Sequence, residues 1–230
     1  MFLVCFSLFG VLVCCGRFIY VVFVWVLWLF MFGDVRRVVY VVLPVLLWPL
    51  SFDVFSRYFV YGMALSTLLL GLLTLVWFPG YLRWFRFGRL LVVLIGVVFA
   101  FIMYVIFIGG YAFLTYLGLS RYVVLVYAMV RGMAGRYVLA VVLVLIGFME
   151  EVYWRGGLQG LVGGVLGREP WVVSMVYYTL VHVLTFNPAL VAGAFVVGLV
   201  DGLLADRVGL VASIITHVVW LELIMVLLPL

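Results

Sequence analysis

Long apolar runs, separated by short charged clusters, extend over the whole chain. In lipid only helices and closed barrels satisfy every backbone polar group, and barrel strands alternate polar and apolar residues. Runs such as Leu90–Leu119 do not alternate, and they exceed the roughly 20 residues that one crossing needs. We therefore expect an all-α fold, a polytopic membrane helix bundle of about six to eight transmembrane helices. The expected helical segments are Met1–Phe32, Val38–Leu50, Tyr58–Phe78, Leu90–Leu119, Tyr137–Leu166, Trp171–Phe186, Ala189–Ala205 and Val208–Leu230.

Charged and helix-breaking residues mark the expected boundaries. A charged cluster at 34–37 predicts a loop, and two prolines within Val38–Leu50 predict a kinked or partial crossing. Pro79–Arg89 predicts a basic, aromatic loop of the kind that faces the cytoplasm, and Gly167–Pro170 predicts a break. The stretch 121–136 is basic as well, so two basic loops flank one span and the orientation stays open.

Composition excludes an ordinary soluble domain. Hydrophobic residues make up 70% of the chain and charged residues 9%, against about 45–50% and about 25% in soluble domains. The thirteen basic residues are all Arg and are scattered between apolar runs. This favours loops that face the lipid bilayer over a nucleic-acid partner. The first charge is Arg17, which favours a retained first segment, so we expect a multi-pass protein of the cell membrane.

Ionisable side chains within the apolar helices are the candidates for function, because burying a charge in lipid is costly. They gather in the last third of the chain, and both histidines of the protein are among them. The residues are Glu150, Glu151, Arg155, His182, Asp201, His217 and Glu222.

Helical spacing separates two roles within the first cluster. Arg155 follows Glu151 by four residues, which is the arrangement for an ion pair. Glu150 lies about 140° away from Arg155 on an ideal helix and keeps no local cation, which suits a general base. Bringing Glu150 together with His182 and His217 requires a cluster of three helices. Small residues at every fourth position permit such close packing; they are Gly156, Gly160, Gly164, Ala194, Gly198 and Gly202.

The order of these motifs resembles the CPBP family, which includes type II CAAX prenyl endopeptidases and bacteriocin-processing or immunity proteins. An EExxxR motif is followed by an aromatic-xxx-His motif, a Gly-rich helix and a histidine on the last helix. The matching residues are Glu150, Glu151, Arg155, Tyr178, His182, Gly198, Gly202 and His217. The resemblance implies a catalytic membrane core over 137–230, with accessory transmembrane helices over 1–136.

The resemblance also implies a mechanism, that of an intramembrane glutamate endopeptidase. Glu150 would act as base on a water that His182 helps to hold, without a metal or other cofactor. His217 would donate to the oxyanion, and Glu151 with Arg155 would form an orienting pair. The expected substrate is a protein or peptide, which could carry a lipid.

One position departs from the family pattern. Asn usually stands four residues after the last histidine, where this chain has Leu221. An oxyanion donor is thus missing, and such donors are worth about 10²–10³ in rate. Trp220 offers an indole N–H that could replace it, although packing alone would also explain a tryptophan there.

Three alternatives stay open at this point. A zinc ion held by two histidines and one glutamate would also activate water, although the chain lacks an HExxH helix. The missing Asn would suit a weak or inactive protein that acts as an immunity, scaffold or partner-binding protein. Asp201 and the other acids would suit a transporter or proton relay.

Overall fold

The computed structural model describes residues 34–80, 90–131, 135–167 and 169–230, and every regular element in these ranges is helical. The chain divides into two compact units, Met1–Val42 and Leu43–Leu230. The candidate site lies wholly within the second unit. The predicted segment Met1–Phe32 and residues 81–89 of the predicted basic loop lie outside the described residues.

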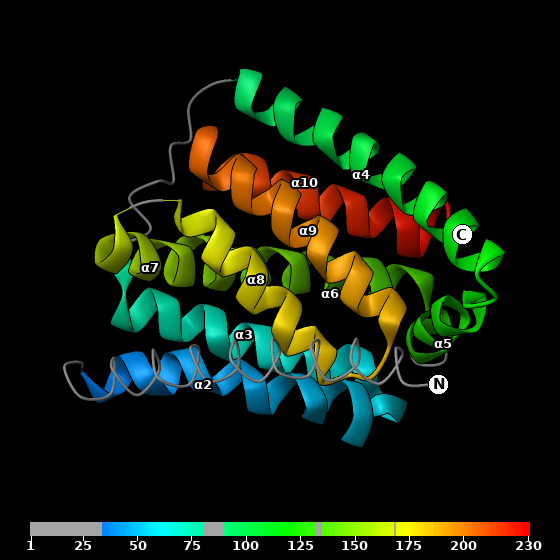
Figure 1. Ribbon diagram of the computed structural model, residues 1–230, viewed down its shortest axis with the longest axis horizontal. Helices are drawn as coiled ribbons and strands as arrows, with labels where there is room; N and C mark the ends of the chain where they lie inside the picture. The colour runs from blue at the N-terminus through cyan, green and yellow to red at the C-terminus, as the bar shows by residue number, and fades with distance from the viewer. Residues whose placement is uncertain (1–33, 81–89, 132–134, 168) are drawn as a thin grey trace, which may run out of the picture. The chain divides into compact units, whose positions relative to one another are not determined.

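The helical elements follow one another with short connections (Figure 1). They are α2 (Val35–Pro49), η1 (Leu50–Val54), η2 (Ser56–Tyr58), α3 (Phe59–Trp77), α4 (Leu90–Tyr116), α5 (Ser120–Arg131), α6 (Arg136–Glu151), η4 (Val152–Leu158), α7 (Gln159–Leu166), α8 (Pro170–Val183), α9 (Pro188–Arg207), α10 (Leu210–Glu222) and η5 (Leu223–Leu227).

Six segments of the described residues are long and apolar enough to cross a membrane, which confirms the polytopic helical fold. They are Val35–Val54, Ser56–Trp77, Leu90–Tyr116, Arg136–Val165, Pro188–Arg207 and Leu210–Leu227. Helices α5 and α8 are apolar but shorter.

The prediction of a loop over 34–37 is wrong, because α2 already begins at Val35. Asp34 caps this helix: its Oδ1 accepts the backbone N–H of Arg36 at 3.1 Å, and its carbonyl accepts that of Arg37. Pro44 stays inside the helix, and the wider π-helical turn of η1 follows Pro49. The segment therefore reaches a length that can cross a membrane.

Two predicted helix ends also differ from the structure. Helix α8 ends at Val183 and not at Phe186, and a short turn leads to Asn187. The Asn187 side chain accepts the backbone N–H groups of Ala189 and Leu190, so it begins α9 in addition to marking the end of α8. Asp206 and Arg207 lie in the last turn of α9, beyond its predicted end.

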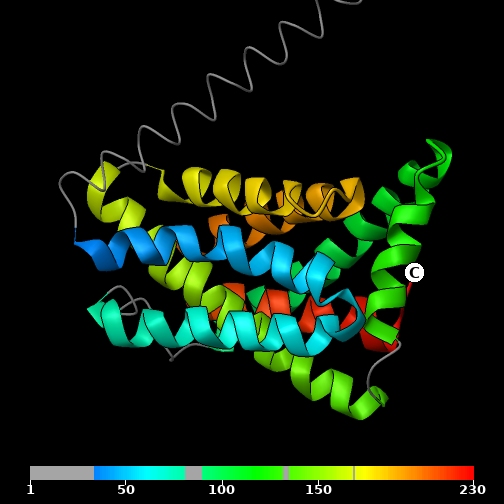
Figure 2. The same ribbon diagram turned by 90° about the horizontal axis from the view of Figure 1, so that it is seen from below.

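Helix pairs that are distant in sequence position the site. Helices α8 and α9 lie side by side in both views, and α10 packs against α4, α6 and α9 (Figures 1 and 2). At Gly198 of α9 a Cβ atom would approach the Cα of Met175 to 3.2 Å, so glycine allows close contact with α8. This confirms the small-residue seam predicted for α9 and brings Asp201 of that helix towards the centre.

Candidate functional site

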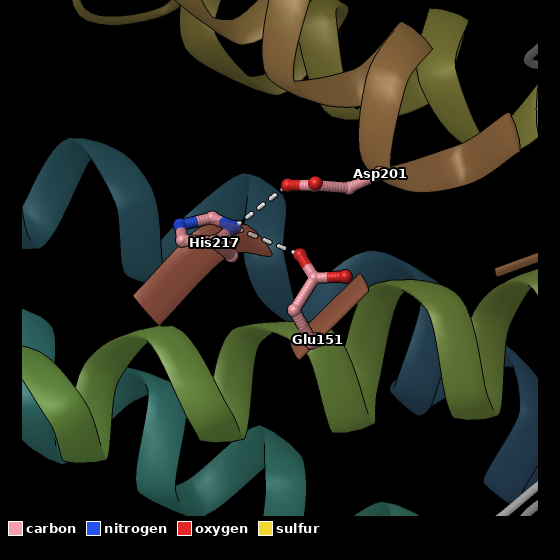
Figure 3. Close-up of side chains that lie close together, drawn as sticks. All are labelled: Glu151, Asp201 and His217. Carbon is pink, nitrogen blue, oxygen red and sulfur yellow. Dashed lines mark hydrogen bonds and ion pairs between the residues drawn. The ribbon is translucent and has the colours of Figure 1, made fainter. Parts of the chain in front are cut away.

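His217 forms the centre of a buried cluster of ionisable groups. It lies on α10 with only 2% of its surface exposed. Its Nδ1 lies 2.8 Å from Oε1 of Glu151 and 3.1 Å from Oδ2 of Asp201 (Figure 3). Its Nε2 lies 3.2 Å from Oε2 of Glu150. Carboxylates from two helices, α6 and α9, thus surround one imidazole from a third.

Glu151 is held by more partners than the sequence predicted. The expected ion pair with Arg155 forms at 2.9 Å between Oε1 and Nη1. The hydroxyl of Ser213 donates to Oε2, and His217 donates from Nδ1 to Oε1. Both carboxylate oxygens therefore have partners, which suits a residue that orients its neighbours.

A π-helical segment follows the two glutamates directly. Residues Val152–Leu158 are π-helical, a form that is rare and frequent at functional sites. The wider turn means that the 100° step assumed for this stretch does not apply there. Arg155 still pairs with Glu151, and its Nη2 donates to the carbonyl of Val197 on α9 at 3.1 Å. The ring of Tyr178 lies 4.8 Å from the guanidinium carbon on another side.

Asp201 belongs to the cluster but has no hydrogen bond among the described residues. The side chain is fully buried, and neither carboxylate oxygen has a hydrogen-bond partner there. The 3.1 Å approach to Nδ1 of His217 is not a hydrogen bond, because that nitrogen carries one proton and directs it at Glu151. The contact is therefore electrostatic.

His182 lies on α8 and does not share a described hydrogen bond with Glu150 or His217. Its Nδ1 contacts the carbonyl of Tyr178 at 2.8 Å, and its Nε2 contacts the indole Nε1 of Trp48 at 3.1 Å. Both ring nitrogens thus have protein partners. The expected three-helix cluster forms, but Asp201 occupies the third place that the sequence gave to His182.

The three candidate residues Glu150, His182 and His217 nevertheless line the same cavity of about 250 Å³. Its remaining walls are mainly apolar and come from α3, α4, α5, α9 and α10. Glu150 reaches the cavity with 4% of its surface exposed. An apolar chamber with a few polar groups at one wall is the usual form of a site for a hydrophobic ligand or peptide.

Trp220 and Leu221 both line this cavity. The indole of Trp220 packs on Phe107, with ring centroids 4.6 Å apart, and meets His217 edge-on at 5.7 Å. Its Nε1 is buried and has no hydrogen-bond partner in the described part of the chain. Leu221 supplies only an apolar surface, so a side-chain amide is indeed missing at this wall.

A metal could be considered at the His217 cluster. Within the described residues, Glu151, Asp201 and His217 form the one group of three potential ligands, with donor atoms within 4.8 Å of one another. His182 is not part of it. The donor set fits poorly, because Arg155 and Ser213 already hold the oxygens of Glu151 and a positive guanidinium lies beside the cluster.

The fold and the site together define a multi-pass helical membrane protein with a buried glutamate–histidine centre. Residues 132–221 match the family model described as type II CAAX prenyl endopeptidase Rce1-like. The CPBP resemblance predicted from the motifs is confirmed over this segment, which supports a membrane protease of the CAAX type. No curated protein and no solved structure matches the chain.

Sequence reasoning missed two residues that contact the site. Ser213 lies one helical turn before His217, a spacing that could have indicated a shared face. Trp48 lies 134 positions before His182. No local pattern connects a tryptophan in an apolar helix with a histidine so far along the chain.

Proposed function

We propose that this protein is an endopeptidase of the cell membrane that hydrolyses a peptide bond with water activated by Glu150. The observation that carries the proposal is the position of Glu150 at the cavity wall, 3.2 Å from Nε2 of His217. Unlike Glu151, it pairs with no arginine. A carboxylate beside an imidazole in an enclosed chamber is suited to moving a proton.

In the proposed reaction Glu150 takes a proton from water while the water oxygen bonds to the substrate carbonyl carbon. The carbonyl oxygen becomes an oxyanion, to which Nε2–H of His217 donates once Glu150 has been neutralised. Glu150 then passes its proton to the leaving nitrogen as the C–N bond breaks. One water is consumed, and a carboxylic acid and an amine are formed.

Glu151 and Arg155 support this reaction without contacting the substrate. Glu151 holds Nδ1 of His217, so Nε2 points to Glu150 and the reacting atoms. Arg155 neutralises Glu151 and ties it to α9 through the Val197 carbonyl. We further propose that the reaction needs no metal, since the oxygens of Glu151 already have protein partners.

A second candidate function is a partner-binding or immunity protein that retains the fold without proteolysis. Leu221 favours it, because the cavity lacks the amide that the family pattern places there. Its signature would be a phenotype that survives loss of the Glu150 carboxylate.

Comparing peptide termini in membranes distinguishes the two candidates. Cells would carry either the native chain or Glu150→Ala in its place, and new protein termini would be identified by mass spectrometry. We expect at least one fragment to disappear with Glu150→Ala and with His217→Ala. Identical termini in all three membranes, with the native phenotype retained, would favour the partner-binding function.

A further inference from the structure

Trp48 meets His182 in the buried interior of the second unit. The indole is fully buried, and His182 is 5% exposed. Trp48 lies at the end of α2, outside the segment that matches the family model. Its ring packs edge-on against Trp154 and His182, with centroids 5.5 and 5.9 Å apart. This packing holds the indole N–H against Nε2 of His182.

The two hydrogen bonds of His182 allow one protonation state. A backbone carbonyl can only accept, so Nδ1 must carry a proton to bond with Tyr178. An indole N–H can only donate, so Nε2 must offer its lone pair to Trp48. His182 is therefore neutral, with its single proton on Nδ1. A proton on Nε2 would face the indole N–H and would leave that donor buried without a partner.

A charged His182 would disturb the proposed reaction. The charged groups that act on its ring are Glu150 from α6, Arg155 from η4 and His217 from α10. On its own helix the ring meets Tyr178 at 4.5 Å, while Trp48 and Phe52 from the α2–η1 segment are uncharged. A proton on Nε2 would thus supply Glu150 with a second cation and weaken it as a base.

We propose that Trp48 is a positioning residue of the site, whose indole N–H keeps His182 neutral with its proton on Nδ1, so that Glu150 has His217 as its single imidazole partner. The role in catalysis rests on the proposed function. The protonation state of His182 does not, and it can be measured without a substrate. Trp48 thereby links a helix outside the family segment to the protonation of the site.

The chain has only two histidines, which makes the protonation state accessible to nitrogen NMR. Protein labelled with ¹⁵N-histidine in detergent micelles gives signals from two imidazoles, and His217→Gln removes one set. We expect His182 to show a protonated Nδ1 and an unprotonated Nε2. In Trp48→Phe, which keeps an aromatic ring but loses the donor, Nε2 should take up a proton about one pH unit higher than in the native protein.

Trp154→Phe is the matched control, because Trp154 belongs to the same aromatic cluster and its buried Nε1 has no hydrogen-bond partner in the described residues. It should change the packing but leave the titration of His182 unmoved. A native His182 with its proton on Nε2 would overturn the proposal even if Trp48→Phe failed to fold. An unchanged titration in folded Trp48→Phe would overturn it too. Either result would leave cleavage by Glu150 standing.

Discussion

Oε2 of Glu150 lies 3.2 Å from Nε2 of His217, while Oε1 of the next residue, Glu151, lies 2.8 Å from Nδ1 of the same ring. Two consecutive glutamates of α6 therefore bracket one imidazole of α10. Only Glu151 also pairs with Arg155, whereas Glu150 lines the cavity. The arrangement gives the two carboxylates different roles, one structural and one facing the cavity.

The buried ion pair predicts a large loss of stability when one partner is removed. Arg155→Met should lower the free energy of unfolding by about 3–5 kcal/mol, because Glu151 would keep a buried charge without its cation. Thermal or denaturant unfolding in detergent would measure the change. Arg207→Met is the control: its ion pairs are exposed, and its effect should stay within about 0.5 kcal/mol. Equal effects of the two changes would contradict this account of the cluster.

Leu221 predicts a gain of function. Leu221→Asn places an amide donor at the cavity wall, one helical turn after His217. Because oxyanion donors are worth about 10²–10³ in rate, kcat should rise at least about tenfold on a substrate found by the comparison of termini. Leu221→Met keeps an apolar side chain and should leave kcat near the native value. No gain in Leu221→Asn would show that this position does not face the oxyanion.

The seam between α8 and α9 predicts a steric effect. A larger side chain at Gly198 must displace the backbone of Met175, since even a Cβ atom would lie 3.2 Å from its Cα. Gly198→Leu should therefore lower the free energy of unfolding by about 1–3 kcal/mol. At Gly109 of α4 nothing lies within 4 Å of an added Cβ, so Gly109→Leu should be tolerated. Similar melting temperatures for the two variants would refute the close packing.

Chelation tests the proposal that no metal takes part. Purified protein should contain far less than one zinc per chain, and cleavage should continue after dialysis against a chelator. The expectation follows from the existing partners of the Glu151 oxygens and from the guanidinium beside them. Loss of cleavage on chelation and its return with zinc alone would instead assign a metal to the cluster of Glu151, Asp201 and His217.

Local patterns predicted most of the fold and the Glu151–Arg155 pair. Helices follow from apolar runs of sufficient length, and the pair follows from a spacing of four residues. The loop over 34–37 was wrong because charged side chains at 36 and 37 can occupy the exposed first turn of a helix that Asp34 caps. Charge alone does not separate a loop from a helix end.

The hydrogen bonds within the site could not be predicted in the same way. Asp201 was one of seven candidate residues, but its place beside His217 depends on how closely α9 and α10 pack. His182 and Trp48 meet only after α2 and α8 have folded together. Such contacts depend on tertiary packing and leave no periodic signal in the sequence.

The most direct test of the central claim is kcat of the purified, reconstituted protein on a substrate found by the comparison of termini, measured for Glu150→Gln. The account predicts that kcat falls by at least about 10²-fold, because the amide cannot take a proton from water. Asp53→Asn makes the same chemical change at an exposed residue and should retain native kcat. Native kcat in folded Glu150→Gln would contradict the assignment of Glu150 as the base.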